Sequence, residues 1–197
     1  GSGKSTLIKI IAGVYQPDGG EIVIDGKPVH HLTPIDSVRH AVQVIYQDFS
    51  LFGNLTVAEN LALNTELRAK RKVVNWRSVR ALGRSALDRL GVDIDLDADL
   101  ETLPTSGKQL VAIARALMSD ARLIIMDEPT TALTGNEVET LFRIVRDIQR
   151  QGIAVLFVSH KMREMLEISE HLTLIRNGKK VVEGPTSNFD EASVIRH

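Results

Sequence analysis

The chain has 197 residues, of which 43% are hydrophobic and 25% are charged, and its formal net charge is −1. This composition is typical of a globular protein with a buried core, and it gives no electrostatic reason to expect nucleic acid as the main partner. The absence of cysteine excludes disulfide frameworks and cysteine-based zinc sites. No apolar run approaches the length of a transmembrane helix.

The first six residues predict a phosphate-binding loop. They read Gly1-Ser2-Gly3-Lys4-Ser5-Thr6 and match the second half of the P-loop pattern G-x-x-x-x-G-K-[ST], directly before an apolar helical run. In such a loop backbone N–H groups surround phosphate oxygens, the lysine reaches the β- and γ-phosphates, and the next hydroxyl group, here Ser5, ligates Mg²⁺. The front of the motif and the strand expected before it are missing, so we interpret the chain as a fragment. A Gly-Ser N-terminal scar followed by a chance lysine is the alternative.

The remaining pattern predicts an α/β fold in which apolar strands alternate with helices. We expect a helix over 4–12, strands over 21–24, 27–29, 41–46, 122–126 and 153–158, and helices that begin at Thr56 and span 76–90, 107–118 and 134–149. Thr56 and Thr134 each precede a glutamate by three residues, as in a capping box. Residues 172–176 are expected as a short helix, followed by an Asn177-Gly178 turn, a strand over 179–183 and a last short helix from Ser187.

The middle of the chain differs from its two ends, because the residues after 47 are mostly helical while strands lie on either side of them. We therefore divide the chain into a first core part over 1–47, a helical subdomain over 48–118 and a second core part over 119–197. The continuous apolar strand over 153–158 is typical of a parallel sheet that is covered on both faces.

Two acidic residues follow a buried strand in the run Leu123-Ile124-Ile125-Met126-Asp127-Glu128, which has the form of a Walker B motif. The carboxyl end of such a strand is where open α/β sheets bind ligands. Asp127 would hold Mg²⁺, and Glu128 would be the general base that polarises the water attacking a γ-phosphate. The alternative is an acidic turn after a core strand.

Two further polar residues, Gln47 and His160, also follow predicted strands. The amide of Gln47 could contact Mg²⁺ or the attacking water, and His160 could donate a hydrogen bond to the γ-phosphate. A surface glutamine and a structural histidine are the alternatives, and spacing alone does not decide between them.

Taken in order, these motifs resemble the ATP-binding cassette (ABC) ATPases, and the resemblance covers essentially the whole chain. The residues that carry it are the first six, Tyr46-Gln47, Ser106-Gly107-Lys108-Gln109 before an apolar helix, Ile125-Met126-Asp127-Glu128-Pro129-Thr130 and Val158-Ser159-His160. The resemblance implies a RecA-like P-loop NTPase core with a mainly parallel sheet and an inserted α-helical subdomain, with ATP and Mg²⁺ as cofactors. It also implies that Gln47 is the Q-loop residue, Glu128 the base and His160 the switch histidine, and that residues 131–134 form the D-loop.

Within this family the chain is similar to the ATPases of bacterial importers of ribose, galactose and xylose. The segments that carry this similarity span residues 44–48, 54–60, 129–134 and 159–164. The similarity implies carbohydrate import, with a second ABC ATPase module, fused or homodimeric, membrane permease subunits and indirectly a periplasmic sugar-binding protein as partners. It implies a peripheral place at the cytoplasmic face of the bacterial inner membrane, and no nucleic acid.

Two motifs depart from the family pattern. The signature usually reads Leu-Ser-Gly-Gly-Gln, and the ungapped alignment places Leu103-Pro104-Thr105-Ser106-Gly107 there, so that Thr105, Ser106 and Gly107 would face the ATP of the partner module. A shifted alignment places Ser106-Gly107-Lys108-Gln109 at the signature instead. The D-loop carries Thr134 where the family usually has aspartate. A non-transport ABC ATPase acting on ribosomes or DNA, a small-molecule P-loop kinase and a catalytically weak half-module therefore remain as alternatives.

Overall fold

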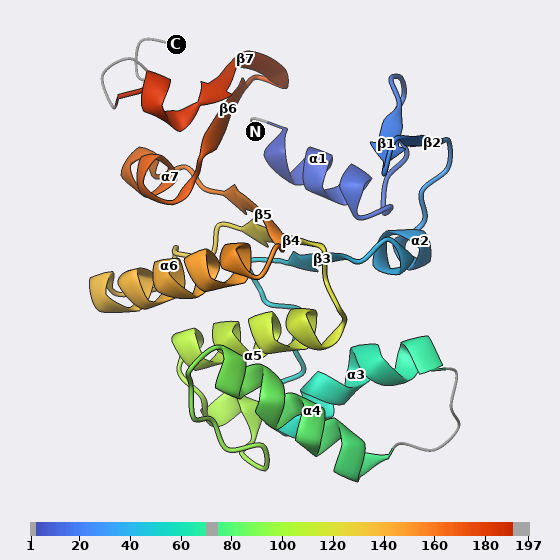
Figure 1. The fold of residues 1–197 in the computed structure, drawn as a ribbon, viewed down its shortest axis with the longest axis vertical. Helices are drawn as coiled ribbons and strands as arrows, with labels where there is room; N and C mark the ends of the chain where they lie inside the picture. Colours follow the sequence, from blue (N-terminus) through green and yellow to red (C-terminus); the bar gives the residue numbers. More distant parts are fainter. Residues whose placement is uncertain (1–2, 70–74, 191–197) are drawn as a thin grey trace.

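The computed structural model of the protein describes residues 3–69 and 75–190, and it has a parallel sheet at its centre with helices on both faces (Figure 1). The helices are α1 (Lys4–Ile11), α2 (Pro34–Arg39), α3 (Val57–Ala69), α4 (Trp76–Arg89), α5 (Thr105–Met118), α6 (Gly135–Arg150) and α7 (Met162–Ile168), with 3₁₀ turns η1 (Leu100–Thr102) and η2 (Thr186–Asn188). The strands are β1 (Ile22–Ile24), β2 (Lys27–Val29), β3 (Val42–Ile45), β4 (Leu123–Asp127), β5 (Ala154–Val158), β6 (His171–Arg176) and β7 (Lys179–Pro185). None of the helices in these two ranges is long and apolar enough to cross a membrane.

The central sheet has the order β3-β4-β5, and both strand pairs are parallel. The pairing aligns Ile45 with Met126 and Asp127 with Val158, so all three strands end at the same edge of the sheet. The hairpins β1–β2 and β6–β7 are antiparallel and form separate small sheets. The predicted α/β fold with a parallel sheet is confirmed, and the sheet edge brings the ends of three distant segments together.

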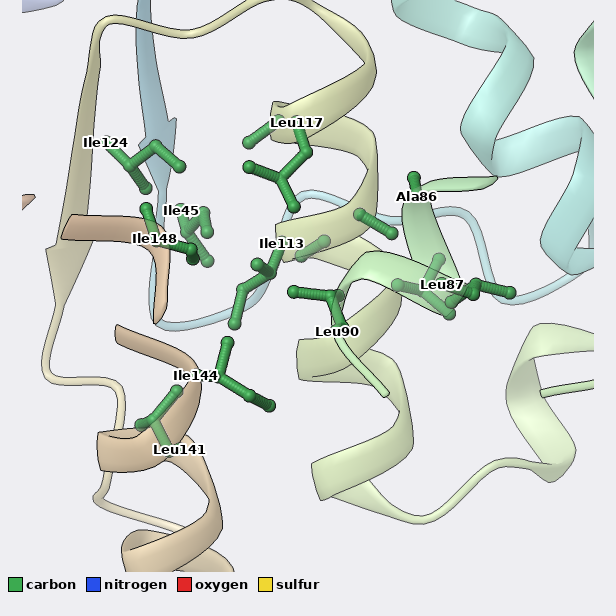
Figure 2. Close-up of a cluster of buried hydrophobic side chains, with 14 of the residues drawn as sticks. Ile45, Ala86, Leu87, Leu90, Ile113, Leu117, Ile124, Leu141, Ile144 and Ile148 are labelled. Atoms are coloured by element: carbon green, nitrogen blue, oxygen red, sulfur yellow. The ribbon is translucent and has the colours of Figure 1, made fainter. Parts of the chain in front are cut away.

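The two faces of the central sheet are covered by different helices because successive side chains of a strand point to opposite faces. On one face Ile125 packs in a small cluster with Ile8 of α1 and Val42 of β3. On the other face Ile124 and Met126 belong to a larger cluster that extends through α5 and α6 to the helices α3 and α4 (Figure 2). Ile113 of α5 lies at the middle of this larger cluster and is fully buried.

Both predicted capping boxes are present and set the starts of the helices that they precede. Thr56 accepts a hydrogen bond from the Glu59 amide at 3.2 Å, and the Glu59 carboxylate accepts one from the Thr56 amide at 2.7 Å. Thr134 and Glu137 make the same reciprocal arrangement before α6. The predicted helix over 107–118 begins two residues earlier, at Thr105, because Pro104 with its fixed φ of −62° takes the N-cap position.

Three predictions about elements are wrong or incomplete. Residues 172–176 belong to strand β6 and not to a helix, because they pair with β7 in an antiparallel hairpin. The predicted last short helix from Ser187 is only the 3₁₀ turn η2. The short helices α2 and α7 were not expected, although Thr33 and Asp36 form a capping box at the start of α2.

The face of α4 that packs against α3 carries a glycine where an amphipathic helix usually presents a large apolar residue. Leu82 is 45% exposed, and the neighbouring Gly83 is buried in its place. A Cβ atom on Gly83 would lie 2.9 Å from Leu61 Cδ1 of α3. The glycine therefore allows a close approach of the two helices, which a pattern of large apolar residues does not reveal.

Candidate functional site

A pocket opens at the carboxyl ends of the three parallel strands, next to the start of α1. Its volume is about 620 Å³, which lies in the range of small-molecule sites. The residues that line it are Gly3, Lys4, Ser5, Thr6, Gln47, Asp127, Glu128, Thr131 and His160. The structure thus brings the predicted Walker A, Q-loop, Walker B and switch residues together, except Gly1 and Ser2, which lie outside the described residues.

The loop before α1 presents backbone donors and one lysine to this pocket. Gly3 has a φ of +90°, a left-handed conformation that residues with a Cβ atom rarely adopt, and its carbonyl accepts the Leu7 amide at 3.0 Å. Lys4 is the first helical residue, and the first turn of α1 carries no acidic side chain. The unpaired N–H groups of a helix start attract anions, so this end of the pocket suits a phosphate.

Asp127 provides the acidic side of the pocket at the end of β4. Burial raises the pKa of its carboxyl group, the neighbouring charge of Glu128 raises it further, and Lys4 opposes these effects. A carboxylate in this position is therefore costly until a cation compensates its charge. A divalent metal ion together with phosphate oxygens is such a compensation, and one carboxylate is enough for Mg²⁺ bound with a phosphate.

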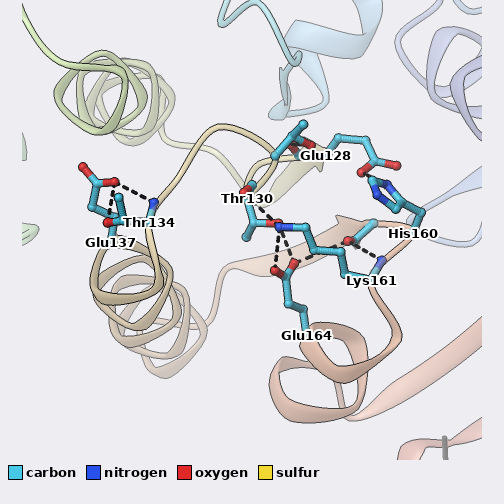
Figure 3. Close-up of polar contacts among 9 residues, drawn as sticks. Glu128, Thr130, Thr134, Glu137, His160, Lys161 and Glu164 are labelled. Atoms are coloured by element: carbon cyan, nitrogen blue, oxygen red, sulfur yellow. Dashed lines mark hydrogen bonds and ion pairs between the residues drawn. The ribbon is translucent and has the colours of Figure 1, made fainter.

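Glu128 adopts a left-handed backbone conformation with φ of +52°, although it is not a glycine. Its amide donates to the Val158 carbonyl at 2.8 Å, and its own carbonyl accepts the Thr131 hydroxyl at 3.1 Å. Backbone strain of this kind persists where the surroundings hold it, and it occurs preferentially at functional sites. The turn directs the Glu128 side chain across the pocket towards His160 (Figure 3).

The carboxylate of Glu128 and the ring of His160 are in direct contact. Glu128 Oε2 lies 2.6 Å from His160 Nδ1, and the histidine side chain is 63% exposed while that of the glutamate is 17% exposed. When Glu128 is ionised its carboxylate only accepts hydrogen bonds, and Nδ1 is then the donor of this contact. The structure thereby joins the two residues that sequence reasoning had placed after different strands.

A second polar network adjoins the Glu128 turn, and it was not predicted from the sequence. Thr130 is fully buried, and its hydroxyl donates to Glu164 Oε2 at 2.5 Å. Lys161 Nζ bonds to Glu164 Oε1 and to the Thr130 carbonyl, both at 3.1 Å (Figure 3). Ser159 Oγ lies 3.4 Å from Glu164 Oε2. The spacing of Lys161 and Glu164, three residues apart at the start of α7, was the one signal that could have predicted this network.

Gln47 lies in the turn after β3, and its side chain is exposed at the pocket. The adjacent Tyr46 is half-buried, and burial raises the pKa of its phenol, as do the charges of Asp127 and Asp48. Gln47 is therefore a neutral hydrogen-bonding group among acidic neighbours, where another carboxylate would add repulsion.

The predicted signature residues Thr105, Ser106 and Gly107 form the first turn of α5 and are not among those that line the pocket. Pro104 occupies the N-cap position and makes no side-chain capping bond. The Ser106 hydroxyl lies close enough to Glu137 to lower the pKa of the Glu137 carboxyl group. Ser106 thus connects the start of α5 to the start of α6.

A larger groove, with a volume of about 840 Å³, lies between β5 and β6 and shares Lys4 and His160 with the pocket. Its lining is mostly apolar, and Ile8, Leu156 and Leu172 belong to it. The smaller pocket carries Asp127 and Glu128 at the end of β4, so it is the better candidate for phosphate chemistry.

A parallel α/β sheet with a Gly-Lys-Ser turn, an acidic strand end and a helix start around one pocket defines a P-loop nucleoside-triphosphatase fold. Residues 1–131 match the ABC transporter family, and the chain belongs to that family. Among solved structures, the ATP-binding cassette MJ1267 of an ABC transporter has a TM-score of 0.86 and 25% identity, over 99% of this chain and 83% of that chain. A nucleotide-free cassette from an ABC transporter has a TM-score of 0.82 and 25% identity, over 99% of this chain and 79% of that chain.

Curated relatives carry names that refer to sugar import. The ribose import ATP-binding protein RbsA 1 of Agrobacterium fabrum is 41% identical over 196 residues, which are 100% of this chain and 38% of that protein. RbsA of Hahella chejuensis is 44% identical over 181 residues, which are 92% of this chain and 36% of that protein. The chain therefore spans less than two fifths of the length of these relatives.

Proposed function

We propose that this chain is an ATP-binding and ATP-hydrolysing module of an ABC transporter that imports a sugar. The observation that carries the proposal is the convergence of Lys4, Asp127, Glu128 and His160 on one pocket, with Glu128 and His160 in contact at 2.6 Å. The relatives are named ribose import ATP-binding proteins, and these names support the proposal that the imported substrate is a sugar.

Different residues of the pocket bind the phosphates and the Mg²⁺ ion of Mg-ATP. The ammonium of Lys4 and the N–H groups at the start of α1 bind the β- and γ-phosphates. The hydroxyl of Ser5, the amide of Gln47 and the carboxylate of Asp127 would hold Mg²⁺, which neutralises phosphate charge when it is bound. The raised pKa of Asp127 fits this role, because a nearby cation stabilises the charged carboxylate that burial and the Glu128 charge make unfavourable.

Glu128 is the general base that polarises the water attacking the γ-phosphate. His160 orients the Glu128 carboxylate through their contact. The contact fixes the ring proton of His160 on Nδ1 while Glu128 is ionised. The other ring nitrogen then donates to the γ-phosphate only when the ring is protonated, or after the contact with Glu128 has opened. We therefore propose that His160 responds to both the base and the γ-phosphate.

The proposal extends to the assembly around the module. A second ABC module, fused or homodimeric, presents its signature to this pocket, and residues 105–107 of this chain serve the partner's ATP. We assign 1–47 and 119–197 to the nucleotide-binding core, and 48–118 to the helical part that faces membrane permease subunits and moves with ATP binding. The module then lies at the cytoplasmic face of the bacterial inner membrane, and a periplasmic sugar-binding protein delivers the substrate.

The test is the variant Glu128→Gln in the full-length protein, with Glu139→Gln on the exposed face of α6 as the matched control. Loss of a general base is expected to lower ATP turnover about a hundredfold or more while ATP affinity stays. Turnover by phosphate release and affinity by calorimetry measure the two quantities. Near-normal turnover of Glu128→Gln would remove Glu128 from the role of base.

A catalytically weak half-module is the second candidate, and Pro104 at the N-cap of α5 favours it. Proline lacks the hydroxyl that a serine would present to the partner's γ-phosphate. Under this candidate Pro104→Ser raises the ATP turnover of the assembled protein, whereas a competent signature leaves turnover unchanged by the substitution.

A further inference from the structure

Arg115 connects helix α5 to the loop that follows Gln47. Its guanidinium donates two hydrogen bonds to consecutive backbone carbonyls, from Nη1 to Ser50 O at 2.9 Å and from Nη2 to Phe49 O at 3.1 Å. A guanidinium is a rigid planar fork, so a pair of bonds to adjacent carbonyls fixes the orientation of the loop as well as its position.

The surroundings of Arg115 are unfavourable for a cation. The side chain lies among buried neighbours on α5, and burial lowers the pKa of its guanidinium. Within residues 3–69 and 75–190, Arg115 makes no ion pair with a carboxylate. Arg115 is half-buried, so its guanidinium is partly withdrawn from water, which is costly unless its donors are used. The two loop carbonyls are the acceptors that offset this cost.

The loop that Arg115 holds is itself in an unfavourable conformation. Phe49 and Ser50 both have left-handed φ values, of +60° and +46°, although each carries a Cβ atom. The Ser50 amide donates to the Asp48 carboxylate at 3.2 Å, and the Phe49 amide donates to the Tyr46 carbonyl at 2.8 Å. These local bonds close the turn, and Arg115 adds the restraint that comes from another element.

Gln47 lies two residues before Phe49 and lines the phosphate pocket. Thr105, at the start of the predicted signature, lies on the same helix as Arg115, about 15 Å away along the axis at the usual rise per residue. We propose that Arg115 is a positioning residue, which holds the loop over 47–50 so that Gln47 points into the phosphate pocket and follows any displacement of α5. This inference rests on the proposed function, because it deepens the role of Gln47 in ATP hydrolysis.

The competing explanation is that Arg115 only anchors α5 to the rest of the fold. An anchor affects melting temperature, nucleotide affinity and turnover together. A positioning residue that acts through Gln47 affects turnover, and its effect disappears when Gln47 has already been removed.

The experiment uses the full-length protein with Mg-ATP as the probe. The variants are Arg115→Gln, Arg115→Lys, Gln47→Ala and the double variant Arg115→Gln/Gln47→Ala. The matched control is Arg122→Gln, which also loses two arginine hydrogen bonds, to Asp25 at 2.7 and 2.8 Å, but does not contact the pocket. The readouts are kcat and KM, the melting temperature and hydrogen exchange of the amides over 47–50.

We expect Arg115→Gln to lower kcat about tenfold while KM changes by less than about twofold. Arg115→Lys retains an intermediate kcat, because an ammonium reaches one carbonyl only. The double variant has the kcat of Gln47→Ala, exchange over 47–50 accelerates in Arg115→Gln, and Arg122→Gln behaves as the unmodified protein.

A kcat of Arg115→Gln equal to that of the unmodified protein overturns the proposal. A double variant in which the two losses of kcat multiply also overturns it. A joint fall of affinity, turnover and melting temperature also overturns it, in favour of the anchor. If the unmodified full-length protein hydrolyses no ATP, the proposed function fails independently. Hydrogen exchange then decides this inference alone: faster exchange over 47–50 in Arg115→Gln supports it, and unchanged exchange overturns it.

Discussion

The phosphate pocket and the large hydrophobic cluster are built on the same strands but differ in what stabilises them. Ile124 and Met126 of β4 are fully buried in the cluster, while Asp127 at the end of the same strand lines the pocket. The cluster is stable through burial of apolar surface and needs no ligand. The pocket instead gathers adjacent carboxylates and a left-handed Glu128, which are unfavourable until a ligand binds.

The apolar cluster therefore stabilises the fold, whereas the charged pocket destabilises it in the absence of a ligand. Substitutions in the cluster should therefore cost stability whether or not nucleotide is present. Substitutions of the charged residues in the pocket should cost function, and some should increase stability.

The largest expected effect on stability is that of Ile113→Ala at the middle of the cluster (Figure 2). Removing a fully buried isoleucine leaves a cavity and is expected to cost about 2–5 kcal/mol. Calorimetric melting of the full-length protein measures it, with Leu82→Ala, at a side chain that is 45% exposed, as the control. Equal melting temperatures of the two variants would contradict the placement of Ile113 at the centre of the core.

An intermediate effect is expected for Thr130→Val, which tests the network behind the Glu128 turn. The substitution keeps the shape of the side chain but removes the donor to Glu164, at an expected cost of about 1–3 kcal/mol for a buried hydrogen bond. Thr140→Val is the control, because the Thr140 hydroxyl bonds within its own helix, to the Asn136 carbonyl at 3.0 Å. If both variants melt at the same temperature, the network does not stabilise the turn.

The smallest effect, and one of opposite sign, is expected for Asp127→Asn in the absence of nucleotide. The folded-state pKa of Asp127 is raised, so the stability of the folded protein falls as pH rises from the unfolded pKa to the folded pKa, and the full cost is present above the folded pKa. Asp127→Asn should melt about 1–2 °C higher at pH 7. The difference should vanish at a pH below the pKa of an unfolded aspartate, about 3.9.

Thermal melting at both pH values, without nucleotide, checks this prediction, and Asp147→Asn on α6 is the control for a change of net charge. A variant that melts at or below the temperature of the unmodified protein at pH 7 would show that the pocket is not energetically costly, and the contrast with the cluster would then disappear.

Sequence reasoning predicted the parts of the fold that are encoded by local periodicity. The apolar runs at β4 and β5 and the capping boxes at Thr56 and Thr134 depend on neighbouring residues, and all are confirmed. Strand β6 was missed because a six-residue run is too short to separate the two periods, and its pairing with β7 is what determines it. Gly83 was missed because its role depends on Leu61 of a different helix.

The same limit holds for the candidate site. The motifs predicted which residues meet at the pocket, since each motif is a short local pattern at the end of an element. They could not predict the contact of Arg115 with the loop at Phe49, or that of Thr130 with Glu164, since these pairs are far apart in the sequence and match no local pattern. The supporting contacts of a site are decided by tertiary packing, which one sequence does not display.

The most direct test of the central claim, that this pocket binds the terminal phosphates of ATP, is the affinity of Lys4→Ala for Mg-ATP by titration calorimetry. Lys9 lies on the same helix outside the pocket, with its ammonium 5.2 Å from the centre of the Tyr15 ring, so Lys9→Ala is the matched control. Loss of a charged hydrogen-bonding group from the pocket is expected to weaken Mg-ATP binding about tenfold to a hundredfold in Lys4→Ala. The affinity of Lys9→Ala for Mg-ATP should equal that of the unmodified protein. Equal affinities of Lys4→Ala and the unmodified protein would contradict the account.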